Sequence, residues 1–223
     1  MGEGTRDTAF LEALCLARGI GGYVFDQANG NKGFSARLEA LSAQKGFSAC
    51  KSILLVSDND ESSGKSFAMI KEQLNDIGFP SPPRALEIAR KKDFPALGVL
   101  MLPYPAIRGS DSGCLETLLI PAMESANPTQ AACVDQLMTC VNVPAWPKKG
   151  ARDKVRVRCL ISTVWHDDPM HGLQYCFAPE KNLIPLGHEI FDGVVEILAN
   201  FQAWSLSDVK TWTEWQAAQS TIR

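Results

Sequence analysis

The sequence predicts an α/β protein in which a mostly parallel sheet has helices on both faces and a helical C-terminal extension follows. Two short apolar runs, at residues 52–57 and 97–102, have the continuous hydrophobicity of strands that are buried on both faces. Helical patterns of about 10–15 residues precede, separate and follow these runs. Strands that alternate with helices of this length form parallel sheets, because each crossover places a helix on a face of the sheet.

The first half of the chain alternates helix and strand. Residues 6–18 carry apolar side chains at helical spacing, and the glycines at 19, 21 and 22 end that helix. A short strand is expected at residues 23–25 and a second helix within 33–46. After the strand at 52–57, a helix is expected at 63–77, with Phe67, Ile70 and Leu74 on one face. A proline-rich break separates that helix from the strand at 97–102.

The second half of the chain is mostly helical in pattern. We expect helices at residues 113–125, 128–141, 151–165, 188–203 and 207–219. The change in pattern near residue 110 divides the chain into an α/β core, residues 1–110, and a helical extension packed on that core, residues 111–223.

Composition excludes several classes of protein. The 223 residues are 45% hydrophobic and 21% charged, so the chain can bury a core and is not globally disordered. A formal net charge of −3 argues against a wholly basic nucleic-acid coat protein, although a local basic groove stays compatible with it. No apolar run reaches the roughly 18–20 residues of a membrane span, and the first residues lack the apolar centre of a signal peptide.

The cysteines favour a reducing compartment. There are 7 of them, at scattered positions and without a CxxC pair, so neither a zinc ribbon nor a thioredoxin motif is indicated. Most have apolar neighbours, which is typical of buried free thiols. We therefore expect a cytoplasmic protein with no membrane association.

An acidic loop follows the first long strand. Asp58 and Asp60 stand two positions apart just past residues 52–57, and ligands of open parallel sheets bind beyond the carboxyl ends of the strands. Mg²⁺ prefers oxygen ligands and is often held by one or two carboxylates together with substrate phosphate. The other interpretation is a hydrophilic loop that caps the helix starting near Ser62.

The wider pattern around this loop resembles the Toprim domain of topoisomerases, primases and OLD-type nucleases. The chain opens with Glu3-Gly4-Thr5-Arg6-Asp7 and a helix, and a hydrophobic strand ending in Asp-x-Asp follows later. The resemblance implies a Toprim-like, Rossmann-like fold and Mg²⁺-dependent phosphoryl transfer on nucleic acid. It implies Glu3 as acid/base or metal ligand, Asp58 and Asp60 as metal ligands, and Asp7 as a supporting acid.

Downstream segments extend the resemblance to roughly residues 1–203. The stretches at 98–119 and 153–203 are similar to uncharacterised bacterial Toprim-like proteins related to OLD-type nucleases. This similarity implies that Glu116 is a second supporting acid and that Lys154 is a catalytic basic residue. The family carries a hydrophobic strand immediately before its E-G-x-x-D motif, whereas only Met1 and Gly2 precede Glu3 here. Three explanations stay open for the strand that would position Glu3: the chain is truncated, its start was assigned late, or the strand has been lost.

Basic residues predict contacts with phosphate. Residues 148–158 hold a run of lysines and arginines in which Arg152 and Arg156 share a helix face. A solvated helix face explains this run equally well. Lys65 lies in Ser63-Gly64-Lys65-Ser66, which resembles the end of a P-loop, but Asn59 stands where the full motif needs glycine. We retain Lys65 as a candidate phosphate contact at a helix N-terminus.

Two histidines form a further candidate metal site. His166 and His171 are five positions apart, and Pro169 between them makes one shared helix face unfavourable. A loop is the expected structure there, and zinc binding is the alternative.

Together these observations favour hydrolysis of phosphodiester bonds in DNA or RNA with Mg²⁺ or Mn²⁺ as cofactor. The alternative is a non-catalytic Toprim-like binding or regulatory module that acts through a protein partner or as a homo-oligomer. A third hypothesis is a nucleotide-binding enzyme that uses residues 63–66.

Overall fold

The computed structural model describes residues 1–107, 112–165, 172–178, 180–181 and 183–222. Its centre is a sheet of strand order β1-β3-β2. Strands β1 (Ser52–Asp58) and β3 (Ala96–Leu102) are the two apolar runs, and they pair in parallel from Ser52 opposite Ala96 to Asp58 opposite Leu102. The short strand β2 (Ile88–Ala89) pairs antiparallel with β3. The protein is therefore α/β as predicted, with a small mixed sheet.

The segment before Glu3 lies along the other edge of β1. Gly2 forms parallel bridges to Val56 of β1 and to Gln27, and the Val56 amide donates to the Met1 carbonyl at 2.9 Å. The prediction of a strand at residues 23–25 is wrong, because no regular strand occurs there. Val24 is 93% exposed, and strand pairing begins only at Gln27.

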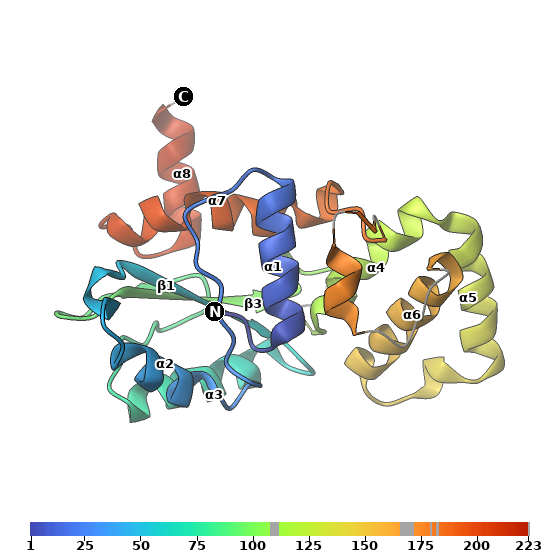
Figure 1. Cartoon of the computed structure of the whole chain (residues 1–223), viewed down its shortest axis with the longest axis horizontal. Helices are drawn as coiled ribbons and strands as arrows, with labels where there is room; N and C mark the ends of the chain where they lie inside the picture. The colour runs from blue at the N-terminus through green and yellow to red at the C-terminus, as the bar shows by residue number, and fades with distance from the viewer. Residues whose placement is uncertain (108–111, 166–171, 179, 182, 223) are drawn as a thin grey trace.

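Helices cover both faces of the sheet (Figure 1). Helices α1 (Thr5–Ala17) and α7 (Asp192–Leu206) lie on one face, and α2 (Phe34–Ser42) and α3 (Ser63–Asp76) lie on the other. Alternate residues of β1 serve the two layers: Leu54 and Val56 join the hydrophobic cluster of α1 and α7, whereas Ile53 and Leu55 join that of α2 and α3. Burial on both faces explains why β1 reads as a continuous apolar run.

A group of three helices packs beyond the carboxyl ends of β1 and β3 (Figure 1). Its members are α4 (Leu115–Ala126), α5 (Pro128–Cys140) and α6 (Lys149–Val164). Short 3₁₀ helices complete the described chain: η1 (Phe47–Ala49), η2 (Val143–Ala145), η3 (Leu173–Phe177) and η4 (Glu189–Phe191). The helices predicted from the sequence all have counterparts with bounds shifted by a few residues, and the region expected as one helix from 188 begins as η4 and continues as α7.

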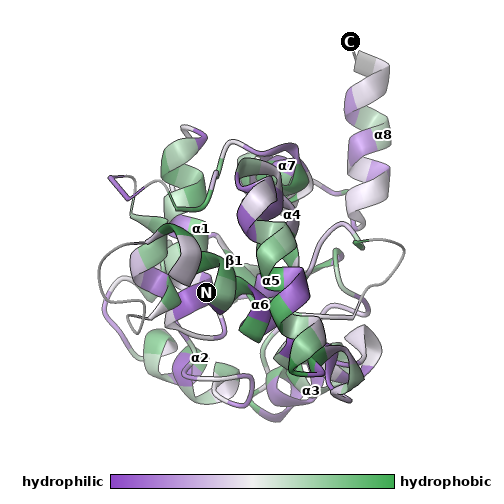
Figure 2. Ribbon diagram, turned by 90° about the vertical axis from the view of Figure 1, so that its right-hand side faces the viewer, coloured by the Kyte–Doolittle hydropathy of each residue, from purple (hydrophilic) through white to green (hydrophobic). Residues whose placement is uncertain are grey.

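The C-terminal half shares the core of the N-terminal half. Phe201 of α7 lies directly on Gly98 of β3, where a Cβ atom would come within 2.9 Å of the phenylalanine ring. Glycine at this position therefore allows close approach of α7 to the sheet. Helix α8 (Trp212–Ile222) anchors Trp212 against Trp204 and then projects away from the body (Figures 1 and 2).

Among the described residues, no helix combines the length and the apolar character that crossing a membrane requires. The cysteines are free thiols in the structure, and their side chains range from buried to exposed.

Candidate metal and phosphate site

A small cavity of about 230 Å³ lies at the carboxyl end of β1. Its walls combine acidic and basic side chains with backbone of two helix N-termini. The lining residues are Glu3, Gly4, Thr5, Arg6, Asp7, Gly30, Asp58, Leu115, Glu116 and Lys154. The space suits an ion and a phosphoryl group better than a whole drug-sized ligand, for which pockets usually measure about 300–1,000 Å³.

Segments far apart in the sequence build this cavity. Asp58 is the last residue of β1, whereas Arg6 and Asp7 lie in the first turn of α1. Glu116 lies in the first turn of α4, and Lys154 comes from α6. The N-termini of α1 and α4 both border the cavity, so their partial positive charges favour an anion there.

Hydrogen bonds hold the carboxylates in place. Glu3 Oε2 accepts from Ser57 Oγ at 2.6 Å and from the Asp58 amide at 3.4 Å. Asp58 Oδ1 accepts from the Leu115 amide at 2.8 Å, which ties the end of β1 to the start of α4.

Two further contacts orient the remaining acids. Arg6 Nη1 donates to Glu116 Oε1 at 3.3 Å, and Glu116 is only 4% exposed. Asp7 Oδ2 accepts from the Gly4 amide at 2.9 Å in a capping arrangement at the start of α1. The site is thus preorganised by contacts between α1, β1 and α4.

The cavity carries more negative than positive charge. Four acids (Glu3, Asp7, Asp58 and Glu116) and two bases (Arg6 and Lys154) line it, so the fully ionised site has an excess of two negative charges. Burial, and then the charges of Asp7, Glu3 and Glu116, raise the pKa of Asp58 well above its ordinary value. Burial also raises the pKa of Asp7, to about 6, with smaller contributions from Glu3 and Glu116.

The pKa of Lys154, one of the two basic residues of the cavity, depends on the same neighbouring acids. Burial opposes the charged form of Lys154, but the neighbouring Cys114, Glu116 and Asp58 outweigh this effect and raise its pKa. Lys154 is therefore held as a cation beside the carboxylates, where it can contact an anionic substrate.

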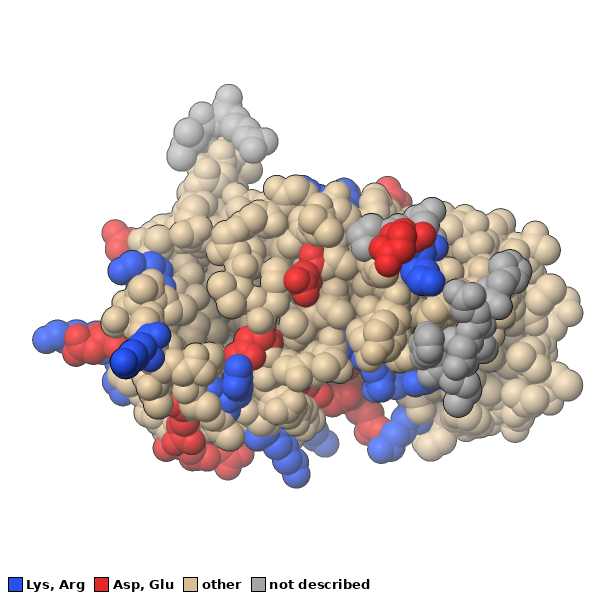
Figure 3. All heavy atoms as spheres, in the orientation of Figure 1, with Lys and Arg blue, Asp and Glu red and all other residues tan. Residues whose placement is uncertain are grey.

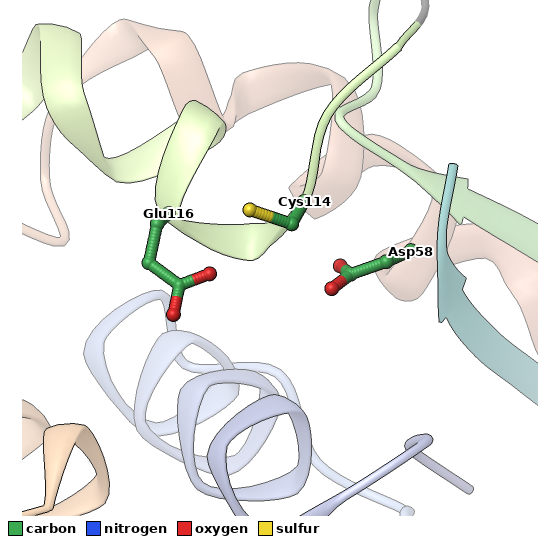
Figure 4. Close-up of side chains that lie close together, drawn as sticks. All are labelled: Asp58, Cys114 and Glu116. Carbon is green, nitrogen blue, oxygen red and sulfur yellow. The ribbon is translucent and has the colours of Figure 1, made fainter. Parts of the chain in front are cut away.

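A cysteine that sequence reasoning did not select lies beside the acids. One ligand atom from each of Asp58, Cys114 and Glu116 lies within 4.8 Å of the other two, and Figure 4 shows the three side chains around one space. Burial, followed by the charges of Glu116 and Asp58, raises the pKa of the Cys114 thiol. The only available signal was the position of Cys114 two residues before Glu116, and no sequence motif marks that spacing.

The structure does not bring Asp60 into the cavity. Asp60 is exposed, has a φ of 51°, and its carbonyl accepts from the Gly113 amide at 2.7 Å. Its turn directs the chain from β1 into α3, and its side chain is not among those lining the site. The cavity thus brings Glu3 and Asp58 together without the side chain of Asp60, and Glu116 also lines it. Lys65 is also exposed and outside the cavity.

The arginines of α6 serve contacts within the helical group. Arg156 pairs with Glu124 of α4 and Asp135 of α5, each at 2.5 Å, so a phosphate would have to displace a carboxylate. Arg152 donates to the Trp146 carbonyl. On the face in Figure 3, acidic and basic side chains of the described residues are intermixed. The histidine pair at 166 and 171 lies outside the described residues.

Comparison with known protein families gives a match over most of the chain. The model of a family of proteins of unknown function, DUF3226, matches residues 1–204. No curated protein and no solved structure matches this chain. The matched region includes every residue that lines the cavity and ends within α7.

Proposed function

The chain belongs to the DUF3226 family, and from its cavity we propose that it is a divalent-metal-dependent phosphoryl-transfer enzyme that hydrolyses phosphodiester bonds of DNA or RNA. We further propose that its α/β core is Toprim-like. The observation that carries the proposal is the excess of two negative charges among the acids and bases of one small, partly buried cavity. An excess of buried charge is costly, so the metal-free site favours protonated acids such as Asp58, and a divalent cation would compensate the charge with the carboxylates ionised.

The donor set fits a divalent cation. Asp58 and Glu116, with Glu3 beside Asp58, supply carboxylate oxygens from three segments. Mg²⁺ and Mn²⁺ both accept such ligands together with substrate phosphate. When bound, the ion would neutralise charge on the transferring phosphoryl group.

The other groups of the cavity suit a phosphate substrate. Lys154 and the amides at the N-terminus of α1 can bind and orient phosphate oxygens, whereas Arg6 would first exchange its contact with Glu116 for one with phosphate. Asp7, with its pKa of about 6, can take a proton from the attacking water near neutral pH. The small cavity volume leaves the rest of the nucleic acid outside, along the surface between α1 and α6.

A nuclease assay tests the proposal. Single- and double-stranded DNA and RNA are incubated with the protein and Mg²⁺ or Mn²⁺, and cleavage is followed for wild type, Asp58→Asn, Glu116→Gln and the control Asp76→Asn. Asp76 is an exposed acid at the end of α3, far from the cavity lining. We expect metal-dependent cleavage that falls at least about 100-fold in the two site variants and is unchanged in the control.

Two outcomes contradict the enzyme assignment. Equal cleavage by wild type and both site variants would show that the activity does not reside in this cavity. Metal binding measured by calorimetry without cleavage of any substrate would favour a non-catalytic binding module instead.

A further inference from the structure

Cys114 has surroundings unlike those of an ordinary buried thiol. It precedes α4, is 0% exposed, and its amide donates to Thr117 Oγ1 at 3.0 Å. Its sulfur lies with the carboxylates of Asp58 and Glu116, and the three ligand atoms are within 4.8 Å of one another. A buried cysteine that serves only packing is expected among apolar side chains.

The environment also excludes a role as a nucleophile. Reactive cysteines are partly exposed and have cationic neighbours that stabilise the thiolate. Cys114 is fully buried, so its sulfur is not presented to a substrate in solution. As a ligand of a divalent cation it would be deprotonated, because a coordinating thiol loses its proton.

Fixed contacts orient the three groups toward one space. Asp58 is held by the Leu115 amide and Glu116 by Arg6, while the Cys114 sulfur lies 4.0 Å from the Gly150 carbonyl of α6. Outer contacts of this kind orient ligands at metal centres. In Figure 4 the three side chains surround the gap between the end of β1 and the start of α4.

We propose that Cys114 supplies a sulfur ligand to the divalent ion held by Asp58 and Glu116, and that the site therefore prefers Zn²⁺ or Co²⁺ to Mg²⁺. The proposal rests on the metal site of the proposed function and adds Cys114 to the carboxylate ligands named there. Thiolate favours such borderline ions, whereas Mg²⁺ favours oxygen.

Coordination requires only a modest contraction of the cluster. Bonds of about 2.3 Å to sulfur and about 2.0–2.2 Å to oxygen in a tetrahedral site place ligand atoms about 3.3–3.7 Å apart, so side chains now within 4.8 Å of one another would approach by up to about 1.5 Å. The S–H bond of Cys114 breaks, a metal–sulfur bond forms, and the proton leaves to solvent. No electron is transferred in this exchange.

Cobalt spectroscopy gives a readout that does not depend on catalysis. Co²⁺ is titrated into the full chain under a non-thiol reductant, and the near-ultraviolet sulfur-to-cobalt charge-transfer band is recorded. The proteins are wild type, Cys114→Ser, Cys114→Ala, Asp58→Asn and the control Cys133→Ser, which alters an exposed cysteine of α5. Calorimetry with Zn²⁺ and Mg²⁺ accompanies each titration.

We expect a saturable band in wild type and Cys133→Ser that is lost in the Cys114 and Asp58 variants. Zn²⁺ should displace Co²⁺, millimolar Mg²⁺ should not, and Cys114→Ser should lower the preference of the site for Zn²⁺ over Mg²⁺ at least about 10-fold. Cys114→Ser and Cys114→Ala each test the assignment of the sulfur, so either decides it if the other fails to fold, and Co²⁺ binding by wild type without a sulfur band overturns the proposal without any variant.

The outcomes separate the two proposals. Co²⁺ binding that depends on Asp58 but shows no sulfur band would overturn the role of Cys114 and leave the metal site of the proposed function intact. A band that persists in Cys114→Ser would place the sulfur ligand elsewhere and overturn this inference. Absence of binding by every ion tested would overturn both proposals.

Discussion

At Asp7, burial in the folded protein disfavours the ionised form of the side chain. It is 8% exposed, lies near the carboxylates of Glu3, Asp58 and Glu116, and accepts a stabilising hydrogen bond from the Gly4 amide. A buried ionised acid is costly to the folded state, and this cost is the physical source of its raised pKa. Side chains of this kind are typical of functional sites, since packing alone would favour an apolar residue.

Replacement of Asp7 by Asn should stabilise the metal-free protein at high pH. Because the pKa of Asp7 is about 6 in the folded state and 3.8 unfolded, the folded state binds more protons between these values. The free energy of unfolding therefore falls as pH rises from about 4 to about 6. At pH 8 in chelator, Asp7→Asn should be more stable than wild type by roughly 2–3 kcal/mol, and at pH 3.5 the two should match.

Chemical denaturation at the two pH values measures this difference. Glu12→Gln, an exposed acid on the same helix, is the control and should stay within about 0.5 kcal/mol of wild type at both. A variant less stable than wild type at pH 8 would show that the Asp7 carboxylate is compensated in the folded state.

Among the secondary-structure elements, helix α7 joins the two halves of the chain by packing on the sheet. It packs on β1 and β3 opposite α2 and α3, and its Phe201 is 1% exposed. Phe201 also contacts Trp204 edge to face, with ring centroids 6.0 Å apart. A C-terminal helix thereby completes one layer of the core to which N-terminal residues contribute the other layer.

Truncation of Phe201 to Ala should therefore destabilise the whole protein by about 3–5 kcal/mol, because it opens a cavity between α7 and the sheet. Leu206→Ala on the same helix is the matched control: Leu206 is 59% exposed, so its loss should cost no more than about 0.5 kcal/mol. Thermal unfolding followed by circular dichroism measures both. Similar values for the two variants would mean that α7 does not stabilise the sheet.

At the scale of the whole molecule, the cavity lies where three bodies of structure meet. Asp58 comes from the sheet, Glu116 and Lys154 come from the helical group, and Asp7 comes from α1. An ion bound between them would link these bodies, and it would bind the folded chain far better than the unfolded one. Binding should therefore appear as global stabilisation.

Saturating Mn²⁺ should raise the melting temperature of wild type. At about 100 times the Kd the gain is about 2.7 kcal/mol, which for a chain of this length corresponds to roughly 5–10 °C. Asp58→Asn should lose this shift, yet without metal at pH 8 it should be at least as stable as wild type, since burial raises the pKa of Asp58.

Differential scanning fluorimetry with and without chelator checks both parts, with Asp76→Asn as the control that should keep the full shift. An equal rise in melting temperature for wild type and Asp58→Asn would place the stabilising ion elsewhere.

Short sequence patterns by themselves determined most of the secondary structure of this protein. The apolar runs marked β1 and β3, periodicity marked the helices, and the acidic loop marked Asp58. Glu3, Asp7, Glu116 and Lys154 were expected from the resemblance to Toprim domains, and the cavity brings them together with Asp58. Strand and helix patterns are short-range properties, so they can be read without the fold.

Only the tertiary structure decided which neighbours those residues have. It placed Cys114 among the acids, left exposed Asp60 outside the cavity, and used Arg156 in ion pairs with two other helices. These outcomes depend on how α4 and α6 pack against the end of β1, over sequence separations of roughly 50–100 residues. Local pattern carries no information about such distances, because burial and charge at a site arise from the sum of all segments that meet there.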